Sequence, residues 1–199
     1  MPDLFKRYSI YQLIALFFNV VRTKFLFKNA RIIRFPIDVR GKRFISIKKG
    51  FTTGVGCRLE AYPTKKDIVL FVGENVQIND YVHITAMQNV SIGNNVLMAS
   101  KIYISDCTHG SYKGDENDSN PKSIPSERTL FSSPVKIKNN VWLGESVSVL
   151  PGVTIGEGTI VGANSVVSKS LPDNVIAVGS PARPIKKYNF ESQKWEKYN

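Results

Sequence analysis

An aliphatic residue recurs at every sixth position in the second half of the chain, and this spacing constrains the fold more than any other feature. The stretch VTIGEGTIVGANSVV (153–167) shows it at Ile155, Val161 and Val167. A six-residue period fits neither an α-helix nor the two-residue alternation of a single strand. The register persists through six consecutive lead positions, which are Ile137, Leu143, Val149, Ile155, Val161 and Val167.

Further repeats extend the pattern towards the N-terminus. The fifth hexad position is also small or apolar, at Val141, Val147, Val153, Thr159 and Ser165. Earlier runs cover 72–83 and, after a two-residue slip, 92–104, and a weaker set at Ile47, Thr53 and Leu59 indicates coiling before residue 50. Such repeats predict a solenoid in which three hexads close one triangular turn and equivalent aliphatics stack eighteen residues apart.

The corners of this solenoid need residues that tolerate unusual backbone conformations. Glycine and asparagine are the usual choices. We therefore expect the corners at Gly156, Gly162, Asn139, Asn140 and Asn164. Stacked coils then share main-chain hydrogen bonds in the manner of parallel strands.

Positive charge is concentrated at the N-terminal end. Of the net charge of +11, most lies in residues 1–50, which hold twelve lysines and arginines against Asp3 and Asp38. A strongly basic segment favours an anionic partner. Nucleic acid is not expected, because the segment lacks interleaved aromatic residues or a binding motif.

The apolar stretch at 8–27 predicts an amphipathic helix with Arg22, Lys24 and Lys28 at its C-terminal end. It is too short and interrupted to span a membrane, and no cleavage site of a signal peptide follows it. Two interpretations stay open. The helix packs on the domain or a neighbouring subunit, which is the commoner arrangement, or it anchors the protein on anionic lipid.

Cysteine and histidine are sparse. Cys57 and Cys107 show no metal-binding spacing and are expected to be free thiols in a reducing compartment. His83 and His109 are too few for a three-histidine zinc site, so we predict no metal and do not favour a hydratase of the carbonic anhydrase type.

Residues 105–134 interrupt the repeat with a polar stretch that contains three prolines. A break of this length predicts an excursion loop, and such loops commonly carry function. His109 lies at its start, where an imidazole could act as a general base. The alternative is a loop histidine that hydrogen-bonds locally. A scaffold without catalytic activity is less favoured, because it would not need this break.

Two motifs carry a family resemblance: NNVWLG at 139–144 and PGVTIGEGTIVGANSVVSKSLPDNVIAVGSPAR at 151–183. Over roughly 45–187 the chain resembles the left-handed parallel β-helix acyltransferases with hexapeptide repeats. It is most similar to sugar O-acetyltransferases of the maltose/galactoside type and to those that modify bacterial surface polysaccharides. The expected fold is all-β: a basic, partly helical segment at 1–40, the left-handed β-helix at 41–187 with its excursion loop, and a short tail at 188–199.

The resemblance implies an acetyl-CoA-dependent O-acetyltransferase that acts on a sugar or glycan precursor, with His109 as the base. It also implies a homotrimer with active sites between subunits. Related sequences often carry another histidine where this chain has Cys107, and covalent catalysis by this thiol is not expected. Acetyl transfer to streptogramin-type xenobiotics or to serine on the same fold stays open. The expected location is the cytoplasm, with peripheral contact at the inner membrane face as the further option.

On the acceptor side, the resemblance places His83 near a family asparagine, where it could bind the acceptor sugar across a subunit interface. The alternative is a surface or interface histidine. His83 and His109 fall at different corners and are not expected to touch within one subunit. Tyr112 is a candidate for stacking on the sugar. Asp106 could orient His109, although an aspartate after a strand mostly serves a turn.

On the donor side, the resemblance places coenzyme A in a groove between coils. Its expected contacts are Trp142, Gly144, Gly162 and Ala163, with Lys169 and Arg183 near the nucleotide phosphates. Glu145 stands where the family often has serine, which puts that one contact in doubt. Corner geometry could equally explain the glycines, and exposure to solvent the two cations.

Overall fold

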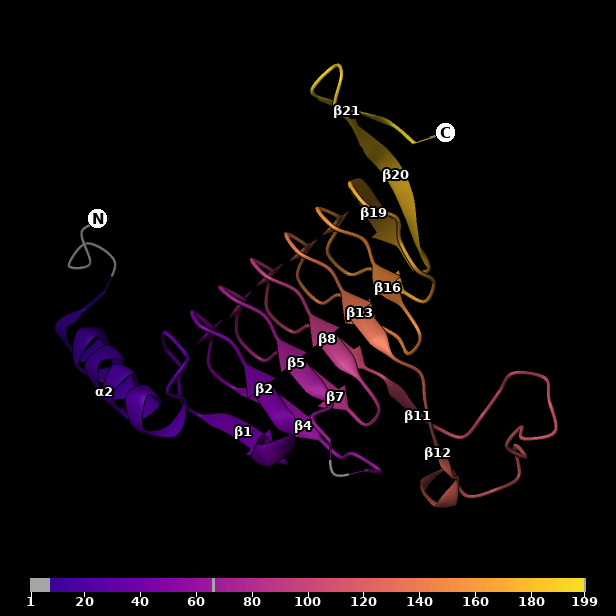
Figure 1. Ribbon diagram of the computed structural model, residues 1–199, viewed down its shortest axis with the longest axis horizontal. Coiled ribbons are helices and arrows are strands. Elements are labelled where there is room, and N and C mark those ends of the chain that lie inside the picture. Colours follow the sequence, from indigo (N-terminus) through magenta and orange to yellow (C-terminus); the bar gives the residue numbers. More distant parts are fainter. Residues whose placement is uncertain (1–7, 66, 199) are drawn as a thin grey trace.

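The computed structural model describes residues 8–65 and 67–198 and shows a parallel β-helix with one N-terminal α-helix. Short strands on successive coils form three sides, each a sheet whose neighbouring coils pair in parallel (Figure 1). The predicted solenoid of hexads is therefore confirmed.

The three sides take their strands in rotation along the chain. Side one contains β1 (Ile37–Arg40), β4 (Cys57–Ala61), β7 (His83–Ala86), β10 (Tyr103–Ser105), β15 (Ser148–Val149) and β18 (Val166–Val167). Side two contains β2 (Ile45–Ile47), β5 (Leu70–Val72), β8 (Val90–Ile92), β13 (Val135–Ile137) and β16 (Thr154–Ile155). Side three contains β3 (Thr52–Thr53), β6 (Gln77–Ile78), β9 (Leu97–Met98), β14 (Trp142–Leu143), β17 (Ile160–Val161), β19 (Val175–Gly179), β20 (Ala182–Asn189) and β21 (Lys194–Lys197).

The lead aliphatics form the core of the β-helix. All six in the second run are buried, and Ile137 stacks on Ile155 as predicted. The spacing between stacked residues differs in the first coils, where Thr53 pairs with Ile78 and Ile78 with Met98. Insertions at the corners therefore change the number of residues per coil while the buried column continues.

The corners confirm part of the prediction and correct the rest. Asn140 and Asn164 both adopt the left-handed conformation, with φ of 58°. Gly156 and Gly162 do not, and they are needed for close approach instead. A Cβ at Gly156 would lie 2.3 Å from the backbone nitrogen of Asp173 on the next coil.

Strands at both ends of the chain extend into the expected flanking segments. β1 pairs with β4, and Ile32 bridges Thr52, so the first coil includes residues expected in the N-terminal segment. β20 runs past residue 187 and pairs with β21, so the expected tail is part of an antiparallel hairpin. Residues 1–7 of the predicted N-terminal segment and residue 199 of the predicted tail lie outside the described residues.

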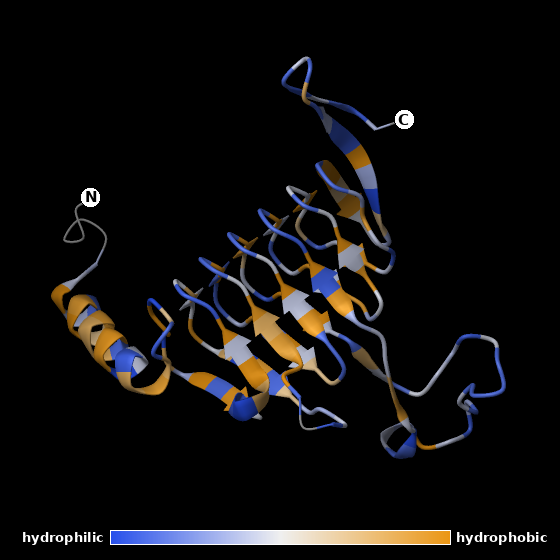
Figure 2. Cartoon of the chain, in the orientation of Figure 1, coloured by the Kyte–Doolittle hydropathy of each residue, from blue (hydrophilic) through white to orange (hydrophobic). Residues whose placement is uncertain are grey.

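The predicted N-terminal helix is present as α2 (Ile10–Leu26), which begins with a capping box formed by Ser9 and Gln12. It contacts the β-helix through a polar stripe, in which Thr23 Oγ1 accepts the N–H of Ile33 at 2.8 Å. Thr23 is the buried residue of α2, whereas most of its apolar side chains are exposed. Figure 2 shows how much of this helix is hydrophobic. Within the described chain the apolar face therefore does not pack on the domain, and the interpretations left are a neighbouring subunit or a lipid surface.

No helix among the described residues has the length and hydrophobicity required to cross a membrane.

Candidate active site at the root of the excursion loop

His109 lies where the chain leaves side one. After β10, the strand β11 (Cys107–His109) pairs in antiparallel fashion with β12 (Leu130–Ser132), and this ribbon carries the excursion loop away from the coils (Figure 1). His109 is exposed, and among the described residues no hydrogen bond holds its imidazole. The ring is therefore free to meet a substrate.

Tyr112 lies against the backbone of His109. Its hydroxyl donates to the carbonyl oxygen of His109 at 2.5 Å and accepts from Nη1 of Arg128 at 2.8 Å. These bonds fix the tyrosine at the start of the loop while its ring remains exposed. The structure thus brings two predicted site residues together.

Asp106 is placed differently from the expectation that it binds substrate or orients His109. Its side chain is 0% exposed, and its carboxylate accepts backbone N–H groups of Met87, Gln88 and Asn89, each at 2.8 Å. The carboxylate therefore faces the turn between β7 and β8. The alternative role in a turn is the one that the structure shows.

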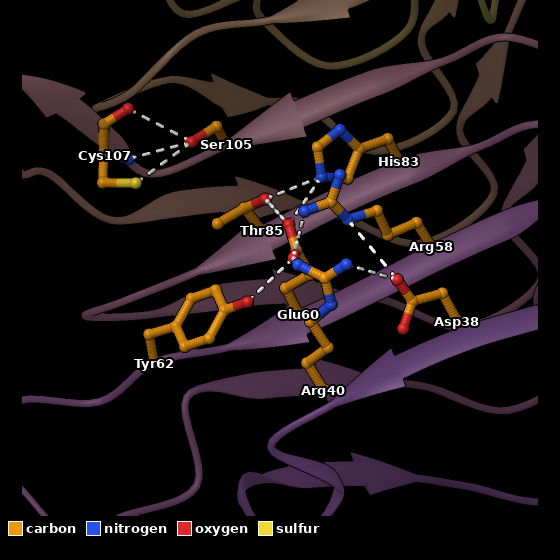
Figure 3. A network of polar contacts seen from close by, with 9 residues as sticks. All are labelled: Asp38, Arg40, Arg58, Glu60, Tyr62, His83, Thr85, Ser105 and Cys107. Carbon is orange, nitrogen blue, oxygen red and sulfur yellow. Dashed lines mark hydrogen bonds and ion pairs between the residues drawn. The ribbon is translucent and has the colours of Figure 1, made fainter. Parts of the chain in front are cut away.

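His83 lies on the outer face of side one, next to the ring of Tyr103 on β10, with centroids 5.6 Å apart. Its Nε2 is 2.8 Å from Oε2 of Glu60 and 3.0 Å from Oγ1 of Thr85 (Figure 3). No contact between His83 and His109 is found among the described residues. The ring is about one-third exposed, so a substrate can reach it.

Glu60 is the centre of a polar cluster that the sequence analysis missed. The residue is only 3% exposed, and its Oε1 accepts from Nη2 of Arg58 at 2.6 Å, Nη1 of Arg40 at 3.0 Å and the hydroxyl of Tyr62 at 2.8 Å. The available signal was the alternation in CRLEAY (57–62), where polar side chains separate the buried Leu59 and Ala61. Alternation predicts a shared outer face, but not which coils meet there.

The carboxyl of Glu60 is held in its charged form. Burial on its own raises the pKa of this group, but hydrogen bonds outweigh that effect and lower the pKa from an ordinary 4.5 to about 2, the donors being His83, Tyr62, Arg58 and Thr85. A buried carboxylate with this many donors stabilises the fold only while it stays ionised.

We expect this carboxylate to make the protein sensitive to acid. Because the folded-state pKa is depressed, the stabilisation is complete above about pH 4.5 and is lost as the pH falls through about 2; it amounts to about 3 kcal/mol. The difference in unfolding free energy between wild type and Glu60→Gln, from denaturant titrations, should shrink over that interval. Glu116→Gln, an exposed change outside the cluster, serves as the control. If the unfolding free energies of wild type and Glu60→Gln changed with pH in parallel, this account would be contradicted.

The small residues predicted to border the donor groove lie together on side three. Trp142 pairs with Ile160, so Gly144 stacks on Gly162 of the next coil. A Cβ at Gly144 would lie 2.7 Å from the backbone nitrogen of Ala163. The close stacking alone requires glycine here. Trp142 and Ala163 are exposed beside these glycines, and this arrangement also fits a narrow ligand arm.

The two predicted phosphate contacts are exposed near the C-terminal end. Lys169 follows β18, and Arg183 lies on β20 opposite Val178. Glu145 caps a corner, since its Oε2 accepts the N–H of Ser100 at 3.0 Å. This bond accounts for a glutamate at a position where the family often has serine. Across the described residues, no three Cys, His, Asp or Glu side chains converge as metal ligands would.

Comparisons with known proteins agree on this class of fold. Residues 134–169 match the family model "Bacterial transferase hexapeptide (six repeats)". The chain is 48% identical over 192 residues, 96% of both chains, to WbbJ of Escherichia coli (strain K12), which is named as a lipopolysaccharide biosynthesis O-acetyl transferase.

Solved structures show the same architecture. A galactoside acetyltransferase in complex with coenzyme A superposes with a TM-score of 0.51 at 31% identity, covering 71% of this chain and 68% of that one. AntD, an N-acyltransferase from Bacillus cereus, gives a TM-score of 0.67 at 23% identity over 93% and 92% of the chains, which supports the fold alone.

The fold defines a class of acyltransferases built on hexapeptide repeats, and the predicted left-handed form of the β-helix is confirmed. The protein belongs to the hexapeptide-repeat acyltransferase family, among its O-acetyltransferases.

Proposed function

We propose that the protein transfers an acetyl group from acetyl-CoA to a hydroxyl of a sugar or glycan precursor, with His109 as the general base. The observation that carries this proposal is the exposed imidazole of His109, held on a β-ribbon at the root of the loop. The relation to WbbJ supports a glycan acceptor.

The imidazole of His109 supplies the general base that this reaction needs. A hydroxyl is a poor nucleophile at neutral pH, and acetyl-CoA supplies the activated acetyl group when bound. The neutral ring of His109 takes the hydroxyl proton as the oxygen attacks, and it returns that proton to the departing thiolate. The β11–β12 ribbon fixes the backbone that carries this ring.

On the donor side, Trp142, Gly144, Gly162 and Ala163 border the groove for the pantetheine arm. Lys169 and Arg183 meet the phosphates, for which cations are suited. On the acceptor side, His83 and Tyr112 contact the sugar.

Turnover of acetyl-CoA by the purified full chain, followed by thiol release, tests the function. The acceptors are free sugars, nucleotide-linked sugars, serine and a streptogramin. Acetylation of a sugar alone supports the proposal. Activity only on serine or the streptogramin would instead identify the alternative enzyme on the same fold, and absence of turnover with every acceptor would count against the activity.

We also propose that the enzyme is a homotrimer with its active sites between subunits, as the family resemblance implies. His83 and His109 do not touch within one chain, which fits a site completed by a neighbour. Sedimentation equilibrium should give three times the chain mass of 22.3 kDa. A monomer at assay concentrations that retains activity would overturn this part.

The outward face of α2 supports peripheral membrane contact at the cytoplasmic side. The exposed apolar residues form one contiguous face at helical spacing, comprising Ile10, Ile14, Phe17, Phe18, Val21 and Phe25. This face lies opposite Asn19 and Thr23, which dock the helix, and Arg22 and Lys24 flank it. An apolar face bordered by cations is typical of helices at an anionic lipid surface.

The double variant Phe17→Asp/Phe25→Asp tests this contact. Both side chains are largely exposed, at 63% and 80%, so the variant should fold normally. We expect wild type to co-sediment with vesicles containing phosphatidylglycerol, and the variant to lose most of this binding. Vesicles of phosphatidylcholine alone should bind wild type more weakly. If the variant instead breaks the trimer and leaves vesicle binding intact, the face belongs to a neighbouring subunit.

A further inference from the structure

The Glu60 cluster occupies the outer face of side one, in line with the strand that leads to His109. In register, Arg58 of β4 lies beside His83 of β7, and His83 lies beside Tyr103 of β10. From β10 the chain passes through Asp106 into β11. The cluster therefore lies on the side of the β-helix that the chain leaves to form the strand with His109.

The two oxygens of the Glu60 carboxylate have different partners. Oε1 meets two guanidinium groups and one phenol hydroxyl, those of Arg40, Arg58 and Tyr62. Oε2 meets His83 and Thr85. A guanidinium group can only donate a hydrogen bond, and the phenol hydroxyl is able to donate one. Oε1 therefore accepts from all three partners.

The position of Oε2 decides which nitrogen of His83 carries the proton. Oε2 lies 2.8 Å from Nε2, and two lone pairs at that distance would repel each other. The hydroxyl of Thr85 donates to Oε2 at 3.1 Å, so its oxygen is left to accept from Nε2 at 3.0 Å. Both neighbours of Nε2 are thus acceptors, and Nε2 must donate.

The other ring nitrogen is left for a substrate. Nδ1 points away from Glu60 and Thr85 (Figure 3), and among the described residues no hydrogen bond to it is found. In a neutral ring with Nε2 protonated, Nδ1 carries a lone pair. It can then accept a hydrogen bond from a hydroxyl group but cannot donate one.

We propose that Glu60 is a positioning residue that fixes His83 with its proton on Nε2, so that Nδ1 accepts a hydrogen bond from a hydroxyl of the acceptor. The substrate class that fits is a polyol such as a sugar. The positive charges of Arg40 and Arg58 are already balanced by ion pairs with the carboxylates of Asp38 and Glu60. The role towards the acceptor rests on the proposed function, whereas the protonation pattern does not.

The presence of only two histidines in the chain makes a direct test possible. Nitrogen-15 NMR of histidine-labelled full-length protein reports the protonation of each ring nitrogen, and His109→Ala assigns the remaining signals to His83. The spectra are recorded at a pH above which the His83 signals no longer change, so that the ring is neutral. Wild type should show a protonated Nε2 and an unprotonated Nδ1. The reverse pattern, or a doubly protonated ring, would overturn the proposal without any variant of Glu60.

Glu60→Gln should reverse the pattern. The three donors at Oε1 retain the carbonyl oxygen of the new amide, which turns its NH₂ group towards His83. Nε2 must then accept, and the ring proton moves to Nδ1. Thr85→Val, which leaves the Glu60 contact in place, should keep the wild-type pattern. An unchanged pattern in folded Glu60→Gln would show that Glu60 does not select the tautomer.

Kinetics test the link to the acceptor. Once the panel above identifies an acceptor, Glu60→Gln should raise its KM by about tenfold, the loss expected for one neutral hydrogen bond, and leave the KM for acetyl-CoA unchanged. An unchanged acceptor KM together with a reversed tautomer would overturn the acceptor role alone. If no acceptor is turned over, the proposed function fails, and the NMR result still decides the role of Glu60.

Discussion

His109→Ala should lose acetyl transfer by a factor of about 10² to 10⁴ in kcat, which is the usual contribution of a general base. The loss should fall on kcat rather than on binding of acetyl-CoA, because the proposed role of the ring is to take the proton of the acceptor hydroxyl. Steady-state kinetics with the acceptor found in the panel provide the measurement. Added imidazole should restore part of the lost rate.

The fold should tolerate this change. The imidazole of His109 is exposed and no hydrogen bond holds it among the described residues, so the melting temperature should match wild type. Lys122→Ala, another exposed change in the loop, should keep normal turnover. Near-normal turnover by His109→Ala would reject the proposed mechanism.

Asp106→Ala should destabilise the protein by about 3–5 kcal/mol, because three hydrogen bonds to its buried carboxylate are lost and each contributes on the order of 1–1.5 kcal/mol. Activity should also fall, because the carboxylate anchors the residue whose backbone carbonyl accepts the N–H of Ser133 and joins the two ends of the loop. Denaturant titration gives the stability, and kinetics at low temperature give the activity of the folded fraction.

Asp106→Asn provides the matched comparison. Its amide keeps one oxygen, so it should retain part of the stability that alanine loses. The sequence-based expectation, that Asp106 binds the substrate or orients His109, predicts a different result for the two variants. In that case activity would collapse in both variants while the unfolding free energy stayed near wild type.

The predicted core and the observed core agree because the hexad pattern is local. A lead aliphatic such as Ile155 is buried whatever coil lies above it, so its spacing alone predicts the solenoid. The start of the excursion loop was visible for the same reason, since the pattern stops there. Asn140 and Asn164 were likewise predictable, because a left-handed corner is a property of one residue.

Other features depend on which coils meet. Thr53, Ile78 and Ile137 each pair with a residue at a different sequence separation, because insertions lengthen some coils. Hexad counting therefore could not place Glu60 of β4 beside His83 of β7. It also could not show that Gly156 faces the backbone of Asp173.

The sequence by itself determined the β-helix, its buried column and the position of His109 at the root of the loop. The tertiary structure decided that Asp106 serves a turn, that α2 turns its apolar face outward, and that a buried carboxylate contacts His83. The physical reason is that periodic burial is encoded within each hexad, whereas these contacts depend on the register between coils.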